Sequence, residues 1–309
     1  MKEKPLVSIC LPSYNGGLYI KEAIESAVAQ TYQNIEIVIC EDLSTDNSWD
    51  IICSFTDKRI KASMNKTNHG LVGNFREVLR NATGKYIIYL CIDDLLYADS
   101  VEKLVKLLED DAECNFAFGN VKYIGDRFGQ TTYTFPPVMK DGLWIEESIK
   151  SGKNLTYLIG SLFRRSPDND FDDTIVDLIF FDWYLWLRLG RGKVAFTNDL
   201  VGKHRYHTLN QTKQLTPGFY NNYLGLKKMF ALCFHDNIIT KKQFTIAIDN
   251  LTLRFASTYL DMTKNKEIRY FDAIKKGNKF CYNEGLSPFK LIPKFLFNTA
   301  KFSLIYIFK

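Results

Sequence analysis

The chain has 309 residues, of which 46% are hydrophobic and 24% are charged, and 40 Lys and Arg side chains against 35 Asp and Glu give a net charge of +5. This composition is that of an ordinary globular protein, and the small positive excess argues against nucleic acid as a partner. It suits a protein that binds phosphates or lies beside an anionic membrane surface.

The cysteines and the N-terminal residues bear on where the protein works. The seven cysteines form no CxxC pair and their number is odd, so we expect reduced thiols in a reducing compartment. Residues 1–5 lead straight into a strand-like run without an apolar signal core. No stretch reaches the ~18–20 apolar residues of a membrane span. We therefore expect a cytoplasmic protein.

The first hundred residues alternate between patterns typical of strands and of helices. Continuous apolar runs predict three strands buried on both faces, over 6–11, 35–40 and 86–92. Apolar residues at helical spacing and capping residues predict helices over 19–30, over 44–54 and from 100 onward. This alternation predicts an α/β fold with a mostly parallel sheet covered by helices.

Beyond residue 110 the pattern changes twice. The sequence predicts strands at 116–124, 157–164 and 193–197, an aromatic helix at 179–189 and a long connection at 125–155. From about 216 on, only amphipathic helical patterns occur, at 219–260 and 266–282. We expect a catalytic region over 1–215, with a nucleotide-binding half to about 110 and an acceptor-binding half from about 111, followed by a helical region over 216–309.

Each of the first three predicted strands ends in a polar cluster. The clusters are Pro12–Gly17, Glu41–Asp46 and Asp93–Asp94. Turn or helix-cap chemistry would explain any one of them alone. In open α/β sheets, however, ligands bind beyond the carboxyl ends of the strands. Three clusters at one edge of the sheet therefore predict a binding site.

Four motifs, matched in order and spacing from residue 7 to about 212, resemble those of the family 2 glycosyltransferases of the GT-A fold, especially bacterial enzymes that build surface polysaccharides. They are Val7–Asn15, Glu36–Ser48, Cys91–Asp94 (preceded by Asn68-His69-Gly70 and Gly84–Ile87) and Phe181–Arg188. The resemblance implies a Rossmann-like, mostly parallel sheet flanked by helices, here with a C-terminal helical extension. It also implies an inverting, metal-dependent transfer from a nucleotide-sugar, which we expect to be a UDP-sugar, with Mn²⁺ or Mg²⁺ as cofactor.

On this resemblance, seven residues are expected to bind the donor: Pro12, Tyr14, Asn15, Asp42, Asn68, Asp93 and Arg205. The ring of Tyr14 can stack on a pyrimidine, and Asp42 can accept a hydrogen bond from a ring N–H of the base. A rim position for Tyr14 and a helix N-cap for Asp42 are the alternatives. Arg205 would pair with the diphosphate or lie in a solvated basic loop.

Asp93 and Asp94 predict a metal site, because adjacent carboxylates repel each other unless a cation lies between them and the phosphates. Mg²⁺ and Mn²⁺ join one or two carboxylates to substrate phosphates, and the chain has no glycine-rich phosphate loop. The pattern does not decide which aspartate binds the ion. His207 would ligate the ion or donate a hydrogen bond. An acidic pair at a solvated helix N-terminus is the alternative.

Asp182 is expected to act as the catalytic base that takes the proton of the acceptor hydroxyl. Aromatic neighbours would limit its solvation and raise its pKa, although an N-cap of the aromatic helix is the alternative role. Trp183 is expected to offer the acceptor sugar a stacking face, whereas helical spacing favours core packing for Trp186.

Three residues depart from the family pattern. Cys91 replaces the first aspartate of the D-x-D motif, Leu43 replaces a usual glycine and suggests a shifted turn, and Phe181 replaces an acidic residue. Because of these departures, the alternative remains that the protein is catalytically degenerate and binds glycans or nucleotide-sugars. A sugar-nucleotide pyrophosphorylase is disfavoured, because the loop at Pro12–Asn15 is neither glycine-rich nor basic.

Residues 288–309 combine lysines with aromatic and aliphatic side chains. This pattern predicts an amphipathic helix that lies in a membrane interface, with packing on the catalytic domain as the alternative. We expect peripheral contact with the inner face of the cell membrane and a glycan or lipid-linked acceptor in polysaccharide or lipopolysaccharide synthesis. The sequence makes no prediction of the oligomeric state.

Overall fold

The computed structural model describes residues 4–166, 178, 180–207 and 219–264. They fall into two compact units. The described residues of Met1–Ser148 and Asn154–Leu215 form the first, and those of Ile149–Lys153 and Thr216–Lys309 form the second.

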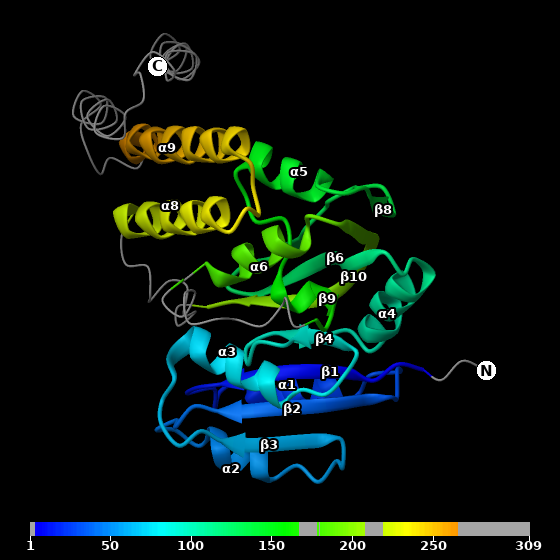
Figure 1. Ribbon diagram of the computed structural model, residues 1–309. Helices are drawn as coiled ribbons and strands as arrows, with labels where there is room; N and C mark the ends of the chain where they lie inside the picture. Colours follow the sequence, from blue (N-terminus) through cyan, green and yellow to red (C-terminus); the bar gives the residue numbers. More distant parts are fainter. Residues whose placement is uncertain (1–3, 167–177, 179, 208–218, 265–309) are drawn as a thin grey trace, which may run out of the picture. The chain divides into compact units, whose positions relative to one another are not determined.

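One mixed sheet organises the first unit, with its strands in the order β3-β2-β1-β4-β9-β6-β10-β5 (Figure 1). Their bounds are β1 (Val7–Ser13), β2 (Ile35–Glu41), β3 (Ile60–Met64), β4 (Tyr86–Tyr89), β5 (Leu95–Leu96), β6 (Cys114–Gly125), β9 (Ser161–Arg164) and β10 (Lys193–Tyr206). The strands β1, β2, β3 and β4 pair parallel with one another, as do β6 and β10. The strands β9 and β5 pair antiparallel with theirs. Short β7 (Gly129–Gln130) and β8 (Val138–Met139) extend β6 and β10.

Alternation along the strands gives the sheet two apolar faces. Every second residue of β1, such as Ile9, packs in one core with buried residues of α1 (Ile20–Val28), α2 (Ser48–Cys53) and α4 (Ser100–Asp110). In α1 the buried side chains recur at helical spacing: Ile20, Ala23, Ile24 and Ala27. The apolar stripe of this helix therefore faces the sheet, as the sequence predicts.

The opposite face of the sheet carries α3 (Gly70–Asn81) and α6 (Phe181–Leu189). The thiol of Cys10, one residue along β1 from Ile9, lies 3.8 Å from the carbonyl oxygen of Val78 in α3. The ring of Phe75 in α3 lies 5.1 Å from that of Tyr89 in β4 and 4.7 Å from that of Phe181. Helices thus cover both faces, which explains why the central strands are apolar on both sides.

Several elements differ from the sequence prediction. The strand predicted as the third is β4, because β3 and α3 precede it unpredicted. Four of the five residues of β3 are exposed, so this edge strand has no apolar run. The short strand predicted at 193–197 is the 14-residue β10, whose register shifts near Thr197 and Leu200. The predicted connection at 125–155 contains α5 (Leu143–Ser151), and η1 (Leu158–Gly160) precedes β9.

The second unit contains the helices α8 (Phe219–His235) and α9 (Lys241–Lys264), which pack side by side (Figure 1). The hydroxyls of Tyr223 and Thr252 lie 3.2 Å apart between them. The side-chain amide of Asn250 in α9 donates a 3.0 Å hydrogen bond to the carbonyl of Ile149. Within the described ranges, no helix has both the length and the apolarity needed to cross a bilayer. The predicted helix at 266–282 and the amphipathic segment 288–309 lie outside those ranges.

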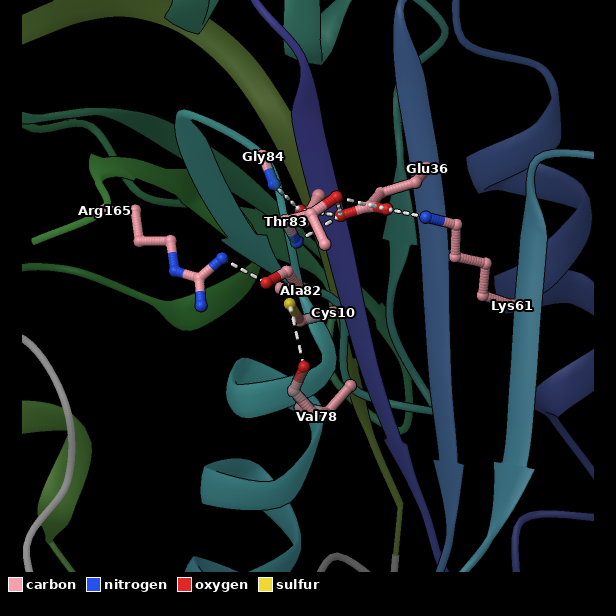
Figure 2. A network of polar contacts seen from close by, with 9 residues as sticks. Cys10, Glu36, Lys61, Val78, Ala82, Thr83, Gly84 and Arg165 are labelled. Carbon is pink, nitrogen blue, oxygen red and sulfur yellow. Dashed lines mark hydrogen bonds and ion pairs between the residues drawn. The ribbon is translucent and has the colours of Figure 1, made fainter.

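A buried carboxylate near the start of β2 joins three strands and a loop (Figure 2). Glu36 accepts hydrogen bonds from Ser8 of β1 (2.5 Å), Lys61 of β3 (2.5 Å) and the backbone N–H of Thr83 (2.5 Å). The hydroxyl of Ser8 in turn accepts a bond from the N–H of Gly84 (2.8 Å). Burial by itself would raise the pKa of Glu36, but these hydrogen bonds outweigh it and lower the pKa to about 2.

The substitution Glu36→Gln is expected to lower the free energy of unfolding at pH 7 by about 3 kcal/mol, because the pKa falls from 4.5 to about 2 on folding. A carboxyl group whose pKa is lowered by folding stabilises the fold fully at pH values above the pKa that it has in the unfolded chain. This contribution is therefore lost as the pH falls from 4.5 towards 2 in the wild type, and it is absent from the variant. Urea unfolding across this pH interval measures both effects.

The matched control is Lys106→Met, because the Lys106 side chain is 71% exposed and pairs with Asp110 rather than with Glu36. We expect it to cost at most about 1 kcal/mol. Equal stability of Glu36→Gln and the wild type at pH 7 would contradict this role of Glu36.

Candidate active site

The carboxylate of Asp42 lies just beyond β2 at the start of α3 and is 1% exposed. It accepts hydrogen bonds from the backbone N–H groups of His69 (2.8 Å) and Gly70 (3.0 Å). Asp42 thus binds the backbone N–H groups at the N-terminus of α3, whereas the sequence-based alternative made it the N-cap of the helix that follows β2. Each carboxylate oxygen accepts up to two hydrogen bonds. Among the described residues Oδ2 receives one, from Gly70, so it can accept another from a ligand.

Three asparagines link α3 to the ends of β1 and β2. Asn74 donates to the carbonyls of Ser13 and Cys40, both at 3.1 Å, and accepts from Asn65. Asn65 also donates to Asp42 at 2.7 Å. The predicted donor residue Asn68 donates to the carbonyl oxygen of Asp42 at 2.8 Å. The sequence analysis missed Asn65 and Asn74, although an amide at position 74 amid the buried residues of α3 is a detectable signal.

The loop after β1 places the other residues of the first motif. Pro12 is buried within β1, whereas Tyr14 is 38% exposed just beyond it. The side-chain oxygen of Asn15 accepts the N–H of Thr45 at 2.9 Å, and its own N–H donates to Ser44 at 2.7 Å. Asn15 thus ties the first loop to the second, and it leaves Tyr14 with a ring that solvent can reach.

Leu43 adopts a φ of 59°, in the left-handed region that favours glycine. The turn after Asp42 therefore has a conformation that the family's usual glycine would adopt without strain. This geometry gives no support for the shifted turn suggested by the sequence. The side chain is 40% exposed, so it contributes little packing in return.

Three potential metal ligands follow β4. The thiol of Cys91 and the carboxylates of Asp93 and Asp94 offer ligand atoms that all lie within 4.8 Å of one another. The backbone N–H of Asp94 donates to the carbonyl of Cys91 at 3.1 Å and closes a tight turn. Ligands of one ion at bond lengths of about 2.0–2.3 Å are separated by up to roughly 4.6 Å. The residues present therefore fit a single divalent cation with little adjustment.

The end of β10 packs beside the turn over residues 91–94, the acidic turn, because Lys203 pairs with Leu95 of β5 directly after it. Asp94 is buried and accepts the N–H of Arg205 at 2.9 Å, and His204 Nδ1 lies 3.1 Å from its Oδ1. Burial outweighs the opposing effect of His204 and raises the pKa of Asp94. His207 Nε2 lies 2.9 Å from Oδ2 of Asp93. Residues 204–207, more than a hundred positions later in the chain, thus hold both aspartates.

The side chain of Arg205 also contacts Asp93 and Glu22. Its Nε donates to the carbonyl of Asp93 at 2.9 Å, and its Nη2 lies 2.6 Å from the carboxylate of Glu22 in α1. The Glu22 side chain is 55% exposed, so the ion pair is solvated and weak. The guanidinium lies beside the acidic turn, where the predicted diphosphate would bind, but the described chain pairs it with Glu22.

Asp182 occupies the second position of α6. It accepts hydrogen bonds from Asn154 (2.9 Å) and from backbone N–H groups at the start of the helix, including that of Trp183. Burial nevertheless raises the pKa of Asp182 to about 6, as expected from its aromatic surroundings. The charge of His204 acts in the opposite direction and lowers the pKa of Asp182.

Cys91 connects Asp182 with the acidic turn. Burial, and then the charges of Asp94, Asp93 and Asp182, raise the pKa of the Cys91 thiol well above its usual range. The charge of Asp182 in α6 therefore reaches the thiol that lies beside Asp93 and Asp94 in the turn after β4.

The expectation that Trp183 stacks on the acceptor is wrong for this structure. The side chain is 4% exposed, and its indole N–H donates to Ser148 at 2.8 Å. Trp186 is fully buried and its ring lies 5.2 Å from that of Phe116. The helix is buried on nearly all sides, so the aromatic residues at 183 and 186 both pack in the core.

Comparisons with known proteins show the family and the fold. The family described as Glycosyl transferase family 2 matches residues 8–169. A relative from Escherichia coli, UDP-Glc:alpha-D-GlcNAc-diphosphoundecaprenol beta-1,3-glucosyltransferase WfaP, is 36% identical over 142 residues, which cover 46% of this chain and 56% of the relative. The chain spans between 31% and 56% of the length of the first curated relatives that it matches.

Two solved structures are similar in fold. Staphylococcus aureus TarS (residues 1–349) in complex with UDP-GlcNAc has a TM-score of 0.64 at 14% identity, covering 89% of this chain and 81% of TarS. The mannosyltransferase PcManGT from Pyrobaculum calidifontis, in complex with GDP-Man and Mn²⁺, has a TM-score of 0.63 at 15% identity, covering 98% of this chain and 81% of PcManGT. The predicted GT-A fold is confirmed.

The positive φ of Leu43 strains the backbone, so its replacement by glycine should stabilise the protein. Leu43→Gly is expected to raise the free energy of unfolding by about 1 kcal/mol, because relief of roughly 1–2 kcal/mol of backbone strain exceeds the entropic cost of glycine. Thermal and urea unfolding measure the change. The control is Leu18→Gly, since Leu18 is 74% exposed but has no positive φ. A loss of stability in Leu43→Gly as large as that in the control would contradict the strain.

Proposed function

Since this chain belongs to glycosyl transferase family 2, we propose that it transfers a sugar from a UDP-sugar to a lipid-linked glycan with inversion at the anomeric carbon. The observation that carries this proposal is the cluster of Asp93, Asp94 and Cys91 at the carboxyl edge of the sheet, with Asp182 near enough for its charge to act on the same thiol. The edge after the parallel strands is where α/β folds bind nucleotides.

The donor side of the proposal rests on the loops after β1 and β2. Tyr14 has an exposed ring for the base, and the free acceptor capacity of Asp42 Oδ2 suits a ring N–H of uracil. Asn68 and Asn15 hold these loops in place. UDP is proposed as the nucleotide because the Escherichia coli relative uses UDP-Glc and TarS binds UDP-GlcNAc.

Asp93 and Asp94 are proposed to hold Mn²⁺ or Mg²⁺ beside the diphosphate. A bound ion would neutralise the charge that grows on the leaving UDP. Asp94 is buried and held by His204 and the backbone of Arg205, whereas Asp93 is only half-buried. We therefore assign direct contact with the ion to Asp93, while His207 orients that carboxylate. Arg205 would exchange Glu22 for a phosphate oxygen.

Asp182 is proposed as the base of a single displacement. As the acceptor oxygen attacks the anomeric carbon and the bond to UDP breaks, Asp182 takes the hydroxyl proton. The side-chain amide of Asn154 donates to Oδ2 of Asp182 and thereby helps to orient the carboxylate. The N–H of Thr156 donates to the side-chain oxygen of Asn154 at 3.2 Å, so the amide is oriented with its NH₂ group towards Asp182. A pKa of about 6 keeps the carboxylate ionised at neutral pH yet more basic than an exposed aspartate.

The acceptor and the location are proposed from the relative and from the C-terminal sequence. WfaP acts on a GlcNAc-diphosphoundecaprenol, a lipid-linked sugar. The basic and aromatic pattern of residues 288–309 suits a segment that lies in a membrane interface. We therefore assign the reaction to polysaccharide or lipopolysaccharide assembly at the inner face of the cell membrane.

Asp182→Asn is expected to lower the transfer rate by at least about 10²-fold, because the amide cannot accept the proton. Binding of the UDP-sugar should persist, since Asp182 lies outside the proposed nucleotide pocket. UDP release with a GlcNAc-diphosphate-lipid acceptor and Mn²⁺ measures the rate, and calorimetry with the UDP-sugar measures binding. The control Asp199→Asn removes an exposed carboxylate of β10 and should leave both unchanged. Wild-type turnover in Asp182→Asn would eliminate Asp182 as the base.

The pH dependence of kcat tests the same group. A base acts only when ionised, so kcat should fall as the pH drops below about 6. The hydrogen bond from Asn154 lowers the pKa of Asp182. Asn154→Leu is therefore expected to move the acidic limb upward by about one pH unit, the equivalent of one charged hydrogen bond. A limb that stays in place or moves downward would show that Asn154 does not act through Asp182.

A further inference from the structure

The proposed function leaves Cys91 without a role, although it stands at the centre of the acidic residues. Its Sγ lies within 4.8 Å of the ligand oxygens of both Asp93 and Asp94. In an apolar strand a thiol is ordinary packing. Cys91, however, follows β4 and is only half-buried, at the edge where the carboxylates gather.

The backbone fixes this placement. The hydrogen bond of 3.1 Å from the N–H of Asp94 to the carbonyl of Cys91 closes a turn over residues 91–94. The turn is held from outside by Arg205 and His204, which bind Asp93 and Asp94. The thiol and the two carboxylates therefore share one rigid segment, and an ion bound to Asp93 lies within reach of the sulfur.

The chemistry of the donor set differs from that of an all-carboxylate site. Mg²⁺ prefers oxygen ligands in octahedral geometry and takes sulfur poorly. Thiolate ligands favour softer first-row ions such as Co²⁺ and Zn²⁺. Replacement of an aspartate by Cys91 in this motif should therefore change which ion binds, without removing the site.

We infer that Cys91 is a direct ligand of the metal ion, and that it makes this site select thiophilic divalent ions over Mg²⁺. This inference rests on the metal site of the proposed function. On coordination the sulfur forms a bond to the ion and its thiol proton passes to solvent. Asp93 supplies the carboxylate ligand, and Asp94 anchors the turn that carries the sulfur and carboxylate ligands.

Titration with Co²⁺ in the presence of UDP tests the inference without a turnover assay. Thiolate coordination produces a sulfur-to-cobalt charge-transfer band in the near ultraviolet, which carboxylate and imidazole ligands do not give. We expect the band in the wild type and in Cys53→Ser, which removes an exposed cysteine of α2. Cys91→Ser should lack the band and bind Co²⁺ at least about tenfold more weakly by calorimetry.

The reciprocal variant Cys91→Asp restores an all-oxygen set. It should bind Mg²⁺ more tightly than the wild type does and lose preference for Co²⁺. Circular dichroism and UDP binding in the absence of metal confirm that each variant is folded. Co²⁺ binding by the wild type without the band, or a band that persists in Cys91→Ser, would overturn the role of Cys91 and leave the proposed reaction intact. Failure of the wild type to bind any divalent ion with UDP would overturn both.

Discussion

The contact between Asp94 and the end of β10 holds the candidate active site together. Asp94 is buried, and a buried carboxylate is costly unless hydrogen bonds satisfy it. The backbone N–H of Arg205 and the imidazole of His204 supply those bonds. They fix the turn that carries Cys91 and Asp93, and they set His207 beside Asp93. Loss of this contact would release the turn that carries the proposed metal ligands.

The sheet order makes this contact possible. The parallel strands β3, β2, β1 and β4 place their carboxyl ends at one edge, so the loops that follow them meet there. Through β9 and β6 the sheet continues to β10, which pairs with β5 directly after the acidic turn. The helix α6 covers the face that α3 also covers, and the charge of its Asp182 reaches Cys91 in the acidic turn. Each half of the domain therefore supplies one side of the proposed reaction.

The sequence predicted those parts of the fold that local patterns determine. The strands β1, β2 and β4 are apolar because they are buried on both faces, and α1 and α4 have a stripe of apolar residues at helical spacing. The edge strand β3 lacks such a signal because most of it is exposed. The length of β10 depends on pairing with β6, a strand some eighty residues earlier, and local periodicity does not encode such pairing.

In the candidate site too, local patterns predicted some features, whereas others depend on contacts between distant parts of the chain. Polar residues after apolar strands predicted the position of Asp42, Asp93 and Asp94, because parallel topology brings strand ends together. Their hydrogen-bond partners came from elsewhere in the chain: α3 for Asp42 and β10 for Asp94. Trp183 was misplaced because an aromatic side chain suits a sugar surface and a core equally well. Only tertiary packing decides between these environments.

The proposed reaction requires one arrangement, in which an ion at Asp93 and the proposed base Asp182 lie on opposite sides of the transferred sugar. A crystal structure of the chain with UDP and Mn²⁺ tests it most directly, because anomalous scattering locates the manganese. We expect the manganese peak at the carboxylate of Asp93, with UDP on one side and the carboxylate of Asp182 across an open space that fits a sugar ring. A manganese peak away from Asp93, or an Asp182 carboxylate directed away from the diphosphate, would contradict the account.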